Sequence, residues 1–194
     1  MATYISEEEA RDIKARTAKP MLWVGIVSIV MLFAGMTSAY VVRQAEGNWL
    51  YFELPQTFYI STAVIVLSSV TMWMAQSAIK KDNLKQTTNM LLATLVLGVV
   101  FTILQFKAWG ELVDMGVFFA GRESNAAGSF LYAISGLHLA HLAGGIIALI
   151  FTSVKAYLKK YSADYHVGIG VAATYWHFLD ILWIYLLLFL VFIR

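Results

Sequence analysis

The sequence has no cysteine, only two prolines and little charge. Without cysteine, disulfides, thiolate metal sites and cysteine nucleophiles are all excluded. Charged residues make up 13% of the 194 residues, whereas a soluble domain has about 25%. The net charge is +2, and no basic stripe interleaved with aromatic residues favours a nucleic-acid partner. These few charges could not cover a water-exposed surface.

Apolar residues predominate instead of charged ones. They make up 60% of the chain, and the mean hydropathy is +0.70. A bilayer core needs about 20 helical residues to cross it, and an open strand would leave its backbone polar groups unpaired in lipid. The sequence therefore predicts an all-α, polytopic membrane protein. Its bundle of five transmembrane helices is expected at residues 20–42, 57–79, 88–106, 126–154 and 167–193.

The predicted domain organisation is an arm at residues 1–19 followed by one transmembrane domain at residues 20–194. The arm is polar and is expected to carry a short surface helix with Ser6 as its N-cap. Lysine and arginine set the orientation of membrane helices. Ten of them fall in the arm and the second and fourth loops, against four on the other side. The N-terminus is therefore predicted to be cytoplasmic and the C-terminus outside.

Small residues recur at every fourth position of the fourth predicted helix. Stripes of this kind let two helix backbones approach closely in lipid. The stripe predicts a tight contact with a neighbouring helix, either in this chain or in another subunit. Its members are Gly136, Ala140, Gly144 and Ala148.

Ionisable residues also lie inside the predicted spans. His138 and His141 are three apart on the fourth helix, and His177 and Asp180 are three apart on the fifth, so each pair shares a helix face. Ionisable groups in membrane helices usually face the bundle interior and pair. The sequence predicts one structural cluster of these four residues, joined by Glu123 from the third loop, that fixes the geometry of the two helices.

Two other interpretations of the same residues remain open. Imidazole suits iron and copper, so His138, His141 and His177 could ligate a metal or a haem, as in a histidine-ligated haem-binding membrane anchor. A proton relay or transporter would need more carboxylates at membrane depth than Asp180 alone. Neither proline lies inside a predicted span, so the broken helices typical of transporters are also missing.

The last helix carries the residues that resemble a known family. Its segment "TYWHFLDILWIYLLLF" is similar to the C-terminal helix of the cytochrome c oxidase subunit III family, which typically reads Tyr-Trp-His-Phe-x-Asp-x-x-Trp. The segments "GSFLYAISGLHLAH", "MLFAGMTSAYVVR" and "LQFKAW" resemble other helices of that family. The matching positions in the last helix are Tyr175, Trp176, His177, Phe178, Asp180 and Trp183.

The resemblance covers all five predicted helices and implies a function. Larger family members have seven helices, so this chain resembles the five-helix bacterial form. It would be the non-catalytic core subunit III of a bacterial haem–copper terminal oxidase, which reduces oxygen to water in aerobic respiration. The expected location is the bacterial cytoplasmic (inner) membrane. The resemblance implies no cofactor or metal on this chain, with haem and copper in partner subunits. The implied partners are subunit I as the main contact, subunit II, a subunit IV or a supercomplex, and membrane phospholipid.

Three departures from the family pattern limit what carries over. The buried glutamates of the family would fall at Ile29, Ala108 and Gly170 in this chain. Carboxylate roles at those positions cannot be transferred, and a contribution to proton uptake or oxygen access stays open. The sequence does not separate an oxidase from a nitric oxide reductase with the same accessory subunit. It also leaves open whether the electron donor is cytochrome c or quinol, and the type of haem.

Overall fold

The computed structural model describes residues 7–163 and 165–193, and within those ranges the chain forms helices and loops only. All five helices are long and apolar enough to cross a membrane. This confirms the predicted fold class, an all-helical multi-pass membrane protein. The helices are α1 (Glu7–Ala45), α2 (Gln56–Lys80), α3 (Leu84–Asp114), α4 (Ala126–Tyr157) and α5 (Val167–Phe192).

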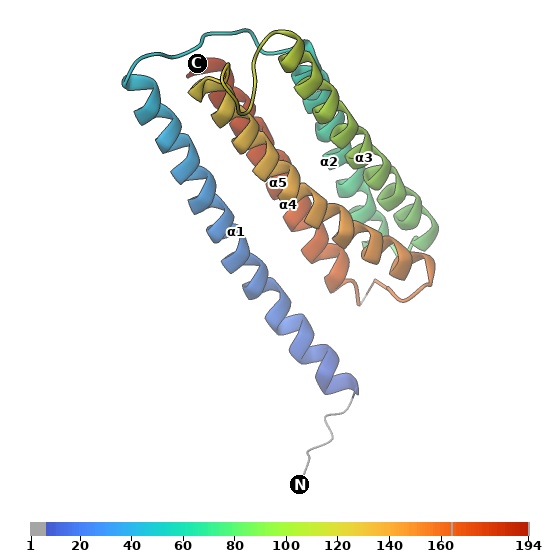
Figure 1. Cartoon of the computed structure of the whole chain (residues 1–194). Coiled ribbons are helices and arrows are strands. Elements are labelled where there is room, and N and C mark those ends of the chain that lie inside the picture. The colour runs from blue at the N-terminus through green and yellow to red at the C-terminus, as the bar shows by residue number, and fades with distance from the viewer. Residues whose placement is uncertain (1–6, 164, 194) are drawn as a thin grey trace.

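The helices α2 to α5 form a bundle, and α1 leans against one side of it (Figure 1). Among the described residues, α2 contacts α3 and α5, and α4 contacts α3 and α5, so α3 and α5 stand diagonally opposite each other. Of the described helices, α4 and α5 are the two that α1 contacts. Figure 1 shows the N-terminal half of α1, in blue, diverging from the bundle. Ala18 and Leu22 in that half of α1 line a groove that they share with α4 and α5.

Helix α1 is longer than the sequence suggested. It begins at Glu7 and runs through Pro20 as one helix of 39 residues. The arm is therefore not a separate short helix where it is described, and Pro20 lies inside the span Arg16–Ala45. Glutamate, alanine, arginine and lysine favour helix before Pro20, and water near the membrane surface can hydrate the carbonyl that proline leaves unpaired. The expected Ser6 cap lies outside the described residues.

Asparagine side chains fix two of the loops. Asn125 caps α4, where its Oδ1 accepts from the Ala127 N–H at 2.9 Å. The same side chain crosses to the α1–α2 loop, where Oδ1 accepts from the Leu50 N–H at 3.2 Å and Nδ2 donates to the Asn48 carbonyl at 3.0 Å. At the other end of the molecule Asn83 caps α3.

Candidate functional site

Trp176 of α5 lies at the centre of the bundle and is fully buried. Its indole N–H donates to the Ser68 hydroxyl of α2 at 2.9 Å. Its ring lies against Gly98 of α3 and Gly145 of α4, where a Cβ added at Gly98 would come within 2.6 Å of the ring. The sequence folds this way because only glycine leaves room for an indole between two helix backbones. One family-motif residue thus joins α5 to three other helices.

The other motif residues extend the same interface. Trp183 donates from its indole N–H to the Thr62 hydroxyl of α2 at 2.9 Å and is 1% exposed. Tyr175 points the other way, and its hydroxyl donates to the His141 carbonyl of α4 at 3.2 Å. Phe178 is half-buried against the core. Buried indole and phenol groups need hydrogen-bond partners, and here the facing helices supply them.

His177 and Asp180 both face α2. The Nδ1 atom of His177 lies 2.6 Å from the Ser69 hydroxyl oxygen. Ser69 is also the polar side chain beside the Asp180 carboxyl group. Asp180 is 3% exposed, and neither of its carboxyl oxygens has a hydrogen-bond partner among the residues that the structure describes. The three side chains form a short polar row along the α2–α5 interface.

His138 occupies a separate position. Its ring centroid lies 5.0 Å from that of Trp183 and 6.2 Å from that of Phe101, and the residue is 1% exposed. Neither ring nitrogen has a hydrogen-bond partner in the described part of the chain. The structure therefore places His138 in an aromatic cage rather than on the His177–Asp180 row.

His141 and Glu123 also lie apart from that row. The Nδ1 atom of His141 is 2.7 Å from the Leu137 carbonyl oxygen, and because a carbonyl only accepts, Nδ1 carries the proton. The His141 ring faces Phe33 of α1 at 5.7 Å. Glu123 is exposed in the α3–α4 loop. In residues 7–163 and 165–193, no group of three His, Cys, Asp or Glu residues is placed to hold a metal ion.

The small-residue stripe of α4 faces outward over much of its length. Gly136 lies beside the Trp109 ring of α3, at 3.8 Å from an added Cβ. Ala140 and Gly144 are exposed. Gly144 and Ala148 line the space between α4 and α1. The stripe therefore meets another helix at Gly136 and borders open space further along.

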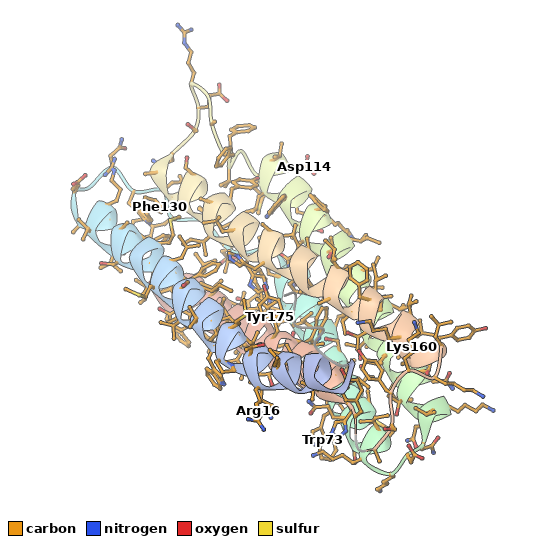
Figure 2. All side chains as sticks on the ribbon, turned by 90° about the horizontal axis from the view of Figure 1, so that it is seen from below. Arg16, Trp73, Asp114, Phe130, Lys160 and Tyr175 are labelled. Atoms are coloured by element: carbon orange, nitrogen blue, oxygen red, sulfur yellow. The ribbon has the colours of Figure 1, made fainter. Side chains whose placement is uncertain are left out.

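That space is a groove of about 900 Å³ between α1, α4 and α5. Its apolar wall includes Leu22, Phe151 and Val171, and its mouth carries the amines of Lys155 and Lys160. Figure 2 shows Tyr175 between the ribbons of α1 and α4, and Lys160 at the end where α4 turns toward α5. The groove has a long apolar interior and a basic entrance.

A tyrosine pair completes the mouth of the groove. Tyr161 and Tyr165 both line it. Burial, and secondarily the neighbouring Tyr165, raises the pKa of the Tyr161 hydroxyl above its usual range. A side-chain hydrogen bond with Thr152 offsets part of this rise. Like other tyrosine hydroxyls, that of Tyr161 is protonated at neutral pH and can donate to an anion beside the lysines.

Comparison with known proteins places these features in a family. The sequence model described as "Cytochrome c oxidase subunit III" matches residues 50–193. A protein named probable cytochrome c oxidase subunit 3 from Nocardia farcinica is 32% identical over 179 residues, covering 90% of this chain and 86% of the relative. A Mycobacterium leprae protein of the same name is 30% identical over 180 residues, covering 88% and 85%. The cytochrome c oxidase subunit 3 of Drosophila yakuba is 32% identical over 135 residues, covering 70% and 48%.

The chain belongs to the cytochrome c oxidase subunit III family. The positions of the missing family glutamates can now be placed on the fold. Ala108 is fully buried in α3, Ile29 of α1 packs against the core, and Gly170 lies in the first turn of α5. None of these three residues is ionisable, so the ionisable residues of the spans lie at other positions of this chain.

The α2 partners of the motif were missed by the sequence analysis. Thr62, Ser68 and Ser69 bind Trp183, Trp176 and His177 in turn. The signal was the segment "VLSSV", in which two hydroxyl residues interrupt an apolar run near the middle of a span. Hydroxyls in membrane helices often bond across to a neighbouring helix, but the segment alone does not name the helix they face.

Proposed function

We propose that this chain is the non-catalytic subunit III of a bacterial haem–copper terminal oxidase. In this role it sits in the cytoplasmic membrane, packs on subunit I and stabilises the enzyme during reduction of oxygen to water. Haem and copper belong to the partner subunits, among them subunit II, and a subunit IV or a supercomplex can extend the assembly. The observation that carries the proposal is the family match over residues 50–193, with the motif tryptophans Trp176 and Trp183 at the bundle centre.

The same proposal includes an orientation with the N-terminus in the cytoplasm. The basic α2–α3 and α4–α5 loops lie at one end of the bundle, where Asp82 Oδ1 accepts from the Ala163 N–H at 3.2 Å. Figure 2 shows Asp114 and Phe130 at the end opposite to Lys160. A single basic end supports a cytoplasmic position for these loops, because positive loops stay inside.

The groove between α1, α4 and α5 is proposed to hold a membrane phospholipid. Its apolar wall suits an acyl chain, and Lys155, Lys160 and the Tyr161 hydroxyl at the mouth suit an anionic headgroup. Basic pockets of this kind on the cytoplasmic side bind anionic lipids. The lipid would fill the space that α1 leaves, and so would fasten α1 to the bundle.

Purification through a tag on this chain in a mild detergent tests the oxidase assignment. We expect haem a or o and copper in the complex, with subunits I and II identified by mass spectrometry. A partner with haem b and non-haem iron would instead assign the chain to a nitric oxide reductase. An intense Soret band on the isolated chain would contradict both and would mean that its histidines hold a haem.

A further inference from the structure

His177 has one nitrogen that the chain does not use. Its Nδ1 is bound to the Ser69 hydroxyl at 2.6 Å. Its Nε2 has no hydrogen bond to any residue that the structure describes, and it is not among the buried polar atoms. The residue is partly exposed. In either tautomer Nε2 can form one hydrogen bond, as donor or as acceptor, and no described residue of the chain forms it.

The depth of His177 makes this nitrogen unusual. Ten residues separate it from Val167, the first residue of α5, which is about 15 Å along a helix and about half of the hydrocarbon thickness. Lipid headgroups and esters do not reach that depth, so lipid offers Nε2 only hydrocarbon. A polar group left unpaired there costs several kcal/mol.

Three hydroxyl groups of the spans show how a polar side chain can be satisfied within its own helix. The hydroxyls of Ser28, Thr102 and Thr174 each donate to the carbonyl four residues earlier in the same helix. An imidazole whose Nδ1 already binds α2 cannot turn Nε2 back in that way. His141 differs too, because its ring lies against Phe33 of α1.

The surface around His177 is apolar and open. Ile181, one turn further along α5, is 67% exposed, and Leu188 on the same side is 48% exposed. On α2, Val66, three residues before Ser69 and so on the same side of the helix, is 40% exposed, and Val70, the residue after Ser69, is 48% exposed. These four residues and His177 define the His177 face, in which one polar atom is surrounded by side chains that another helix could cover.

We propose that the His177 face is the docking site for a transmembrane helix of the catalytic oxidase subunit, and that this helix presents a hydrogen-bonding side chain to His177 Nε2. The bond would extend the row Asp180–Ser69–His177 into the partner. A hydroxyl or amide side chain fits best, since each can serve either tautomer. This inference deepens the proposed oxidase function and depends on it.

Photo-cross-linking in the intact complex tests the docking site. A photoreactive residue replaces Ile181 in one variant and Val96 of α3 in the control. Val96 is 59% exposed and twelve residues into α3 from the same end of the bundle, on the helix diagonally opposite α5. We expect the Ile181 probe to yield a cross-link to the catalytic subunit and the Val96 probe to yield lipid adducts. Lipid adducts alone at Ile181 would overturn the proposal.

Substitution of the histidine tests the hydrogen bond. In His177→Phe the bundle should still fold, as judged by the melting temperature of the isolated chain. The ratio of bound to free catalytic subunit after a detergent wash should fall about tenfold, the factor for one lost buried hydrogen bond. His177→Gln, which can place an amide where Nε2 lies, should recover part of that retention. Equal retention in all three proteins would overturn the proposal.

The two levels of the hypothesis fail in different ways. If the wild-type chain brings down no oxidase subunits, the proposed function itself is wrong. If it brings them down, but Ile181 meets only lipid and His177→Phe changes nothing, the oxidase function stands and the His177 face is not the interface.

Discussion

Trp176 is the residue on which the centre of the bundle depends. Its N–H binds Ser68 of α2, and its ring fills the space that Gly98 and Gly145 leave on α3 and α4. Association of helices in lipid relies on close packing and interhelical hydrogen bonds rather than on the hydrophobic effect. A side chain that hydrogen-bonds to one helix and packs tightly against two others should therefore be sensitive to very small changes around it.

Gly98→Ala is expected to destabilise the bundle. The added methyl group would lie 2.6 Å from the Trp176 ring, and the ring also packs against Gly145 of α4. Overpacking of this kind costs about 1–3 kcal/mol. Thermal unfolding of the detergent-solubilised chain measures the change. Gly110→Ala is the control, because it lies on the same helix and an added Cβ there meets nothing within 4 Å. Equal melting temperatures for the two variants would show that Trp176 can move aside.

Asp180→Leu is expected to loosen the subunit from its complex without changing the haem absorption spectrum. Leucine removes the buried carboxyl group beside Ser69, so the hydroxyl that positions His177 loses its polar neighbour. Asp180→Asn keeps a polar group of the same shape and should retain the subunit. The ratio of subunits after purification, beside the optical spectrum, measures both effects. An altered haem spectrum in a fully retained Asp180→Leu complex would contradict a structural role.

At this scale the sequence predicted which residues are unusual, but not which residues they meet. Spacing of three places His177 and Asp180 on one face of α5, as it does His138 and His141 on α4. It does not give the rotation of one helix relative to the next. That rotation turns Asp180 toward Ser69 of α2 and His138 toward Phe101 and Trp183. Interhelical partners depend on the packing of whole helices, which local spacing does not encode.

At the scale of elements, hydropathy found all five spans, since it reports directly on the bilayer. Helix ends were harder to place. Polar turns extend α1 back to Glu7 and α3 forward to Asp114. These turns lie beyond the apolar segments, so helix propensity, and not hydropathy, accounts for their helical structure. Pro20 was taken as a start for the same reason, although a proline near the water can be accommodated inside a helix.

Asn125 is the element-scale contact most open to a test. It caps α4 and also holds the α1–α2 loop through Asn48 and Leu50. Asn125→Ala should cost about 1 kcal/mol for the lost cap and should also free the loop. Hydrogen exchange at the Leu50 amide should accelerate. Asn83→Ala removes the cap of α3 and should leave the Leu50 amide protected. If both variants leave that amide unchanged, another contact holds the loop.

At the scale of the whole molecule, α1 is held less firmly than its neighbours. Its N-terminal half diverges from the bundle (Figure 1), and the groove between α1, α4 and α5 separates Leu22 from Val171. A phospholipid in that groove would complete the packing of α1. A ligand that binds only the folded state stabilises it by about 2.7 kcal/mol when present at one hundred times its Kd. The stability of this chain should therefore depend on lipid.

Delipidation followed by return of phosphatidylglycerol tests this dependence. The melting temperature of the purified complex should fall on delipidation and recover with phosphatidylglycerol, but less with phosphatidylcholine, because Lys155 and Lys160 at the mouth favour an anionic headgroup. Replacing both lysines by glutamine should abolish the difference between the two lipids. Replacing Lys80 and Lys81 at the C-terminal end of α2 removes the same charge outside the groove and should preserve the difference. If both double variants lose the preference for phosphatidylglycerol equally, that preference depends on the overall charge of the basic end, and the groove is not the binding site.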